Sequence, residues 1–267
     1  MSVIQRRKHQ FCRKVLGENN KIGFVDVGSG GPLKEPWSFI APECLAKFEI
    51  EPTAAGDGNL PLCISNRIGP SKFFVAHDER GSSLHEPSAD FAQRFGQESI
   101  LTKKTIDVSL TTLDELFLAR KHEVDALDVN TEGHDFQVLQ GGGQLLDTGR
   151  IKLIKVEFEL TEVWKEQGWF SDIDAYLRSK LYDMANIELD YAKPRNARDI
   201  NHRGEPLWGK AYYVPSLKLW DRWQGQGDLS ADFRKAIVLD ALADMPGRAF
   251  DLCQWGRQQN GLQDLNL

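Results

Sequence analysis

Short apolar runs alternate with amphipathic, helix-forming segments along most of this chain. The strongest apolar run is IKLIKVEFEL at 151–160, and comparable runs begin at Lys21 and Leu45. Between such runs, residues 171–184 have the spacing of an amphipathic helix. Strands that are apolar on both faces are typical of sheets covered by helices on both sides. The alternation therefore predicts an α/β fold, with a sheet between two layers of helices.

The same patterns place the remaining elements. The predicted strands are 21–28, 45–52, 60–66, 72–76, 106–110, 124–129, 151–160, 186–191 and 211–215. The predicted helices are 113–121, a short one that starts at Gly133 or His134, 171–184 and 230–245.

The strand pattern stops at Pro215, and this divides the chain into three parts. We expect a polar helical lead-in at 1–20, an α/β domain at 21–215 and a C-terminal helical extension at 216–267. A helix with one apolar stripe needs a partner surface, which is either the α/β domain or a second copy of the chain in a homodimer. The stripe on the helix predicted in the extension consists of Phe233, Ile237, Val238 and Ala241.

The charge of the chain argues against nucleic acid as a partner. It has 33 Lys and Arg against 39 Asp and Glu, a formal charge of -6, whereas a phosphate-binding surface requires a basic excess. No run approaches the roughly 20 apolar residues that span a bilayer, and the first residues lack the apolar run of a signal peptide. The four cysteines are scattered, as expected of buried thiols in a reducing compartment. We therefore expect a cytoplasmic protein with no membrane span.

A glycine-rich turn directly after the first strand is the first candidate binding element. The strand runs into Gly28, Ser29 and Gly30, and Asp26 lies two residues before the first glycine. Glycines let a ligand approach the backbone closely. The GxGxxG pattern of diphosphate binders is incomplete, because a leucine stands at the position of its third glycine. The turn therefore suits a ligand without a diphosphate, and a tight turn without any ligand is the alternative.

Glu51, at the end of the next strand, is the second candidate. In nucleotide-binding α/β folds, an acidic residue about 20 positions after the glycine turn accepts hydrogen bonds from the ribose hydroxyls. Glu51 occupies that position in FEIEP. A solvated glutamate at a strand end is the alternative, and the glycine turn upstream favours the ribose role.

A polar cluster follows the strand at 124–129. Asn130, Glu132, His134 and Asp135 come directly after it. Ligands of open α/β sheets bind beyond the carboxyl ends of the strands, so this cluster is expected to face the same crevice. The alternative is a helix start whose acidic residues interact with the helix dipole.

Taken together, these segments resemble FkbM-type S-adenosylmethionine-dependent methyltransferases over roughly residues 21–215. The most specific segment is the Glu-Gly-x-Asp-x-x-Val-Leu block within 132–139. In chain order, the matching segments are Asp26-Val-Gly-Ser-Gly, Glu51-Pro52, Thr112-Leu-Asp114, Asn130-Thr-Glu-Gly-His-Asp-Phe-Gln-Val-Leu, Val156-Glu-Phe-Glu and Pro206-Leu-Trp-Gly-Lys-Ala-Tyr-Tyr-Val-Pro.

The resemblance implies a class I methyltransferase fold, Rossmann-like, with a mostly parallel sheet and an antiparallel last strand. It also implies S-adenosylmethionine as the cofactor and O-methylation of a sugar, glycan or glycosylated small molecule. The implied cofactor-binding residues are Asp26, Gly28, Ser29, Gly30, Glu51 and Asn130. Two positions depart from the family: Asn130 replaces the common Asp, and the first turn lacks the common Ala-Asn continuation.

A hydroxyl acceptor is a poor nucleophile, so a base must take its proton. His134 is the first candidate, because an unperturbed imidazole titrates near roughly pH 6.5. Asp135 could orient His134 or replace it, and Glu132 is expected to be ionised and mainly structural at the helix start. His77, on a loop between strands, is a rival base.

No metal is predicted, because no spacing in the sequence demands one. The chain nevertheless has enough oxygen and nitrogen ligands for a divalent ion if the fold gathers them. These are Glu132, His134, Asp135, Glu157 and Glu159.

Two other function classes remain open at this point. A nicotinamide-dependent Rossmann enzyme is disfavoured by the incomplete glycine pattern. A non-catalytic binding protein on a degenerate methyltransferase fold is supported only by Asn130 in place of Asp.

Overall fold

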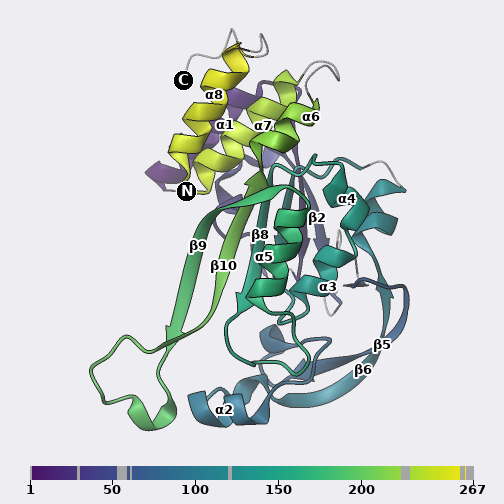
Figure 1. Cartoon of the computed structure of the whole chain (residues 1–267), viewed down its shortest axis with the longest axis vertical. Helices are drawn as coiled ribbons and strands as arrows, with labels where there is room; N and C mark the ends of the chain where they lie inside the picture. Colours follow the sequence, from purple (N-terminus) through teal and green to yellow (C-terminus); the bar gives the residue numbers. More distant parts are fainter. Residues whose placement is uncertain are drawn as a thin grey trace.

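A central sheet organises the chain in the computed structural model, which describes residues 2–28, 31–52, 59–60, 62–119, 122–223, 229–258 and 262. Within these residues the sheet has seven strands in the order β3-β2-β1-β7-β8-β10-β9 (Figure 1). All run parallel except β10, which is antiparallel to both of its neighbours. The strands are β1 (Ile22–Val27), β2 (Leu45–Ile50), β3 (Asn59–Leu60), β7 (Ala126–Val129), β8 (Leu153–Glu159), β9 (Tyr182–Ala192) and β10 (Glu205–Pro215). The predicted mostly parallel sheet with an antiparallel last strand is confirmed.

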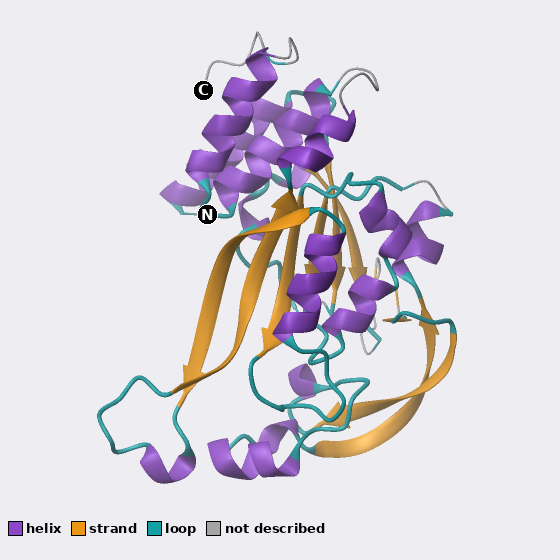
Figure 2. Cartoon of the chain, in the orientation of Figure 1, coloured by secondary structure: helices purple, strands orange, loops and turns teal. Residues whose placement is uncertain are grey.

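Helices pack against both sides of this sheet: in Figure 2 one group lies in front of it and the other gathers at its upper end. In β1, Ile22 and Phe24 pack into one apolar cluster, while Val25 and Val27 pack into another. Successive side chains of a strand point to opposite faces, so the two clusters are the two helix-covered sides. The first side contains α1 (Val3–Leu16), α7 (Ser230–Leu242) and α8 (Pro246–Gln258). The second contains α3 (Asp135–Gln140), α4 (Gly143–Asp147) and α5 (Phe170–Ser179).

The region between β3 and β7 forms a separate small sheet, which the sequence patterns did not predict. Its strand order is β4-β6-β5, with β5 antiparallel to β6. The run predicted as one strand at 60–66 is divided between the two sheets. The strands are β4 (Cys63–Ile64), β5 (Gly69–Ala76) and β6 (Thr102–Thr111), and α2 (Ala89–Phe95) lies between β5 and β6.

Two helix predictions need correction. The helix predicted at 171–184 ends at Ser179, and β9 begins at Tyr182, because Leu181 turns the chain with a φ of 64°. The helix predicted at 113–121 is a π-helical segment at Asp114–Leu118, although the Thr112 hydroxyl caps it by accepting the amide hydrogen of Glu115.

The C-terminal segment contains more helix than predicted. Besides α7, it forms α6 (Leu217–Trp223) and α8. Trp220 stacks on Phe233 with ring centroids 4.9 Å apart, and Trp255 meets both rings edge-on. Helix α7 is buried on most of its circumference, so its predicted stripe is used within the chain and is not available to a second subunit.

One buried carboxylate joins α7 to the sheet. Asp125 accepts the amide hydrogen of Gly23 at 2.8 Å, and it also accepts from Lys152 and Lys235, both at 2.8 Å. Its side chain is only 3% exposed. Burial alone would raise the pKa of Asp125, but the two lysines outweigh it and hold the pKa below its ordinary value. The amino-terminal end of the sheet is therefore tied to α7 by a paired charge cluster.

No helix in the described part of the chain is long and apolar enough to cross a membrane. The four cysteines are all buried and unpaired, as the sequence predicted.

Candidate functional site

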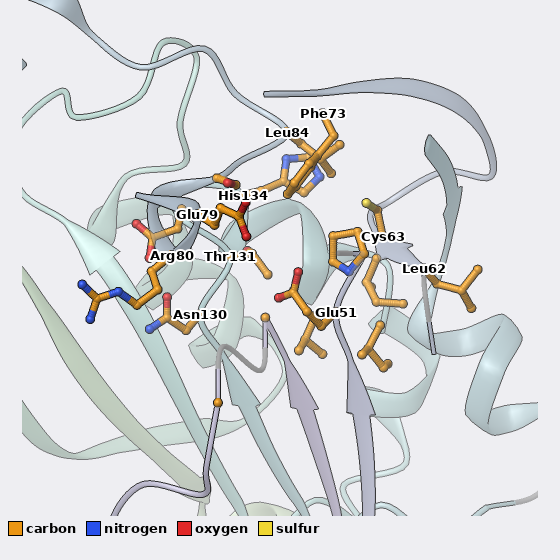
Figure 3. A pocket seen from close by; sticks show the side chains of 18 of the residues that line it. Glu51, Leu62, Cys63, Phe73, Glu79, Arg80, Leu84, Asn130, Thr131 and His134 are labelled. Atoms are coloured by element: carbon orange, nitrogen blue, oxygen red, sulfur yellow. The ribbon is translucent and has the colours of Figure 1, made fainter. Parts of the chain in front are cut away.

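A cavity of about 330 Å³ lies at the carboxyl ends of β1, β2 and β7. Figure 3 shows Glu51 in the middle of its wall, with Arg80 and Asn130 to one side and Leu62 and Cys63 to the other. Glu51 follows β2 and Asn130 follows β7, so the two side chains lie on either side of β1. This is the position where open α/β sheets bind ligands.

Gly28 brings the strand ends close together. Its φ of 86° lies in the left-handed region, and its amide donates to the carbonyl of Ile50 at 2.9 Å. A Cβ at this position would meet the carbonyl oxygen of Asn130 at 1.8 Å. Only glycine fits both the conformation and the space. The other predicted members of this turn, Ser29 and Gly30, lie outside the described residues.

Asn130 lines the cavity and has an unsatisfied polar atom. Its side-chain oxygen is buried and has no hydrogen-bond partner among the described residues, although Asn130 lines the cavity. A buried polar atom without a partner costs free energy, so a bound group that donates a hydrogen bond would be favoured here.

Another part of the cavity wall is largely apolar, and it comes from the small sheet, the segments next to it and the end of β2. The turn after β5 adds two charged residues at the rim, Glu79 and Arg80. These residues could not be predicted from the sequence, because short strands of unknown sheet membership do not reveal which cavity they face. The apolar lining consists of Ile50, Leu62, Ile64, Phe73 and Leu84.

Asp26 lines a smaller adjoining cavity of about 40 Å³ together with Lys34, Lys155 and Lys210. Burial is the main cause that raises the pKa of Asp26 to about 7, and the nearby Asp128 adds to it. Asp128 and Glu157 also line this cavity, and Lys155 pairs with Asp128 at 3.0 Å. Acidic and basic side chains side by side suit a ligand end that bears both charges, such as the α-amino and α-carboxyl groups of an amino acid.

Glu132 lies between the large cavity and a third one of about 220 Å³, and it lines both. It has a φ of 55°, which is strained for a residue other than glycine. Its carbonyl accepts the Ser83 hydroxyl at 2.6 Å, which helps to hold this conformation. Burial is the main cause that raises the pKa of Glu132 well above its ordinary value, and Glu157 and Asp135 add to it. The raised pKa disfavours the expectation that Glu132 is ionised and structural.

His134 lies at the cavity wall, but both of its ring nitrogens are engaged. Nδ1 lies 2.9 Å from Nε2 of His85, and Nε2 lies 3.0 Å from the hydroxyl oxygen of Ser65. Burial is the main cause that lowers the pKa of His134 to about 3, and His85 and Arg67 add to it. An imidazole held neutral and hydrogen-bonded on both sides is a weak base, which disfavours the predicted role of His134.

Asp135 does not line any of these cavities. Its side chain is buried and accepts the amide hydrogens of Thr131 at 3.0 Å and Gly133 at 3.2 Å. This geometry positions the loop that contains Glu132 and keeps Asp135 away from a ligand. The rival base, His77, is exposed and does not line the large cavity.

Among the residues that the structure describes, no three His, Cys, Asp or Glu side chains are grouped so that they could hold a metal ion. Of the possible ligands considered from the sequence, Glu132, Glu157 and Glu159 line one cavity, while His134 lies in the wall of another.

The model of the methyltransferase FkbM domain matches residues 37–184, which is just over half of the chain. A search of curated proteins finds no match. Solved structures with similarity include a methyltransferase FkbM from Methylobacillus flagellatus KT, at 10% identity and a TM-score of 0.38. The match covers 79% of this chain and 50% of that one.

A second similar structure is magnesium protoporphyrin IX methyltransferase from Synechocystis PCC 6803 with bound SAM. It has 11% identity and a TM-score of 0.33, and the match covers 79% of each chain.

The sheet order, the antiparallel last strand and the cavity at the carboxyl ends define a class I methyltransferase fold. Within that class, the chain belongs to the FkbM methyltransferase family.

Proposed function

We propose that this protein is an S-adenosylmethionine-dependent O-methyltransferase acting on a hydroxyl of a sugar, glycan or glycosylated small molecule. The observation that supports it most is the convergence of Gly28, Glu51 and Asn130 on one cavity, in a chain of the FkbM methyltransferase family. The sugar-type hydroxyl rests on the family resemblance.

The residues present fit this donor. Glu51 can accept both ribose hydroxyls, because a carboxylate has two acceptor oxygens. The unpartnered side-chain oxygen of Asn130 can accept a further donor group. Asp26 and Lys34 can meet the amino and carboxyl groups of the methionine end. The apolar wall from the small sheet suits the adenine ring.

S-adenosylmethionine supplies, when bound, a methyl group on a cationic sulfur. The chain itself has to hold the acceptor in line, exclude water and accept a proton. Glu132 is placed for the proton, since it lies between the donor cavity and the adjoining third cavity. A cationic ligand beside Glu132 would lower its raised pKa and favour the ionised form. Glu132 would thus become a base only when the donor is present.

Binding of S-adenosylhomocysteine, which has no transferable methyl group, tests the donor site. We expect Glu51→Ala to weaken binding by roughly ten- to a hundredfold, because a charge-assisted hydrogen bond contributes about 1.5–3 kcal/mol. Glu51→Gln should weaken it less, because one acceptor oxygen remains. Isothermal titration calorimetry measures all three affinities without knowledge of the acceptor.

Glu43→Ala is the matched control, since Glu43 is an exposed glutamate just before β2, at the opposite end of that strand from Glu51. Wild-type protein that does not bind at millimolar ligand would contradict the proposed function. Equal affinity in wild type and Glu51→Ala would contradict the placement of the ribose. Donor binding without turnover on any acceptor would support the non-catalytic alternative.

A further inference from the structure

Acidic and aromatic residues make up most of the wall of the third cavity, of about 220 Å³. The acidic residues are Glu132, Glu157 and Glu159, and the aromatic residues are Phe91, Trp164 and Trp208. The rest of the wall consists of Gln97, Ile100 and Val163. The cavity adjoins the proposed donor site through Glu132, which lines both.

Glu159 lines this cavity and has an unsatisfied side-chain atom. The residue is 3% exposed, and its Oε2 atom is buried with no hydrogen-bond partner among the described residues. Burial is the main cause that raises the pKa of Glu159 well above its ordinary value, and Asp135, Glu157 and Glu132 all add to it. The charged neighbours that act on Glu159 are thus acids. A positively charged hydrogen-bond donor would be favoured for two reasons: it would satisfy the unpartnered oxygen, and its charge would offset the acidic neighbours.

The aromatic part of the wall favours the same kind of ligand. Trp208 is half-buried and meets Phe91 edge-to-face, with ring centroids 6.3 Å apart, and Trp164 is almost fully buried. An aromatic face attracts a cation most strongly where water is excluded. A neutral polyol could also pack on these rings, but it would leave the repulsion among the three carboxyl groups in place.

We propose that the third cavity binds a protonated amine on the methyl acceptor, so that the acceptor class is an amine-bearing polyol such as an amino sugar. The inference rests on the proposed function, because it places the acceptor beside the donor site. In this arrangement the amine contacts Glu159 and the aromatic wall, and the hydroxyl to be methylated lies toward Glu132. The amine is a recognition group and takes no part in methyl transfer.

Glucosamine and glucose are suitable probes, because they differ at one position, where a protonated amine replaces a hydroxyl. Saturation-transfer NMR on the full chain measures their dissociation constants at a pH where the amine is charged, with EDTA present. We expect glucosamine to bind roughly tenfold more tightly than glucose. Glu159→Gln should abolish that preference, whereas Glu86→Gln, on an exposed glutamate, should keep it.

Trp208→Leu provides a second test that leaves all three carboxyl groups in place. It should weaken glucosamine binding several-fold through loss of the aromatic face. Thermal unfolding of each variant confirms that it is folded.

Equal binding of the two sugars, no binding of glucosamine, or an unchanged preference in Glu159→Gln would each overturn the inference. Titration with S-adenosylhomocysteine on the same samples separates this failure from failure of the proposed function, because Glu159 does not line the donor cavity.

Discussion

At the residue scale, Glu132 combines two costs that a purely structural glutamate would not need. Its backbone lies in the left-handed region, and desolvation raises the pKa of its half-buried side chain, which lies between two cavities, well above the ordinary value. The Asp135 carboxylate accepts hydrogen bonds from the amides of Thr131 and Gly133, the residues on either side of Glu132. Strained residues persist only where their surroundings hold them, and they concentrate at functional sites.

We predict that Glu132→Gln lowers kcat by a factor of about 10² to 10⁴ while the affinity for S-adenosylhomocysteine changes little. The raised pKa of Glu132 also predicts the direction in which activity changes with pH. The ionised fraction of Glu132 in the free enzyme grows as the pH rises, so the wild-type kcat/KM for S-adenosylmethionine should increase with pH through that raised pKa. The variant should lose this rise. Methyl transfer to an acceptor that the wild type methylates, measured across pH, checks both expectations.

Glu79→Gln is the control for this experiment, because Glu79 lines the same cavity but is exposed at its rim. Its rate should remain close to that of the wild type. A Glu132→Gln enzyme with normal kcat would show that the base is another group, and His134 would then be the next residue to test.

Some of these residues could be predicted from the sequence and others could not. Gly28, Glu51 and Asn130 follow strands directly, so their position at the carboxyl edge depends only on strand order. The protonation of Glu132 and His134 depends on burial by segments far away in the chain. Local patterns contain no measure of that desolvation, so the sequence could not show that burial raises the pKa of Glu132 and lowers the pKa of His134.

At the scale of elements, the cluster around Asp125 joins β1, β8 and α7 at the end of the sheet opposite the cavity. Three donors converge on one buried carboxylate: the amide of Gly23 and the ammonium groups of Lys152 and Lys235. Removing one member of a buried ion pair leaves the others without compensation.

We predict that Asp125→Asn lowers the free energy of unfolding by about 3–5 kcal/mol. Urea denaturation measures this value. Asp107→Asn removes an exposed partner of Lys72 and should have little effect, because exposed ion pairs contribute little. Lys152 also pairs with Asp232 at 2.5 Å and Lys235 with Glu123 at 3.0 Å. An Asp125→Asn protein as stable as the wild type would show that these two carboxylates compensate for the loss.

Element prediction succeeded where a strand is covered on both faces. Strands β1 and β8 are apolar nearly throughout, and their positions match the predicted runs closely. The end of α5 was placed too late, because the helical pattern continues past Ser179 although Leu181 turns the chain. Residues 246–258 were missed as a helix, because α8 lacks a strong apolar stripe.

At the scale of the whole molecule, the C-terminal helices are part of the main apolar cluster. That cluster joins Phe24 of β1 and Trp37 to Phe233 of α7 and Leu252 of α8. The segment predicted as an extension at 216–267 therefore covers one face of the sheet. The assignment to one face requires contacts between distant segments, which no local pattern reveals.

We predict that a chain truncated after Ser216 does not fold to a soluble monomer. Loss of the segment after Ser216 would expose the apolar face of the sheet that α7 and α8 cover, and exposed apolar surfaces associate. Expression followed by size-exclusion chromatography and circular dichroism tests this. A truncated chain that is monomeric, unfolds cooperatively and still binds S-adenosylhomocysteine would contradict it.

Helix α1 packs against α7, and the carbonyl of Val15 accepts a hydrogen bond from Arg234 at 2.8 Å. During translation, α1 leaves the ribosome before any strand of the sheet, whereas α7 follows after all of them. The apolar side of α1 must therefore remain without its partner while the sheet is synthesised, and closing so long a loop is slow. Chaperones that shield apolar segments of nascent chains should bind this protein until α7 has emerged, so completion of the fold is a late event in its synthesis.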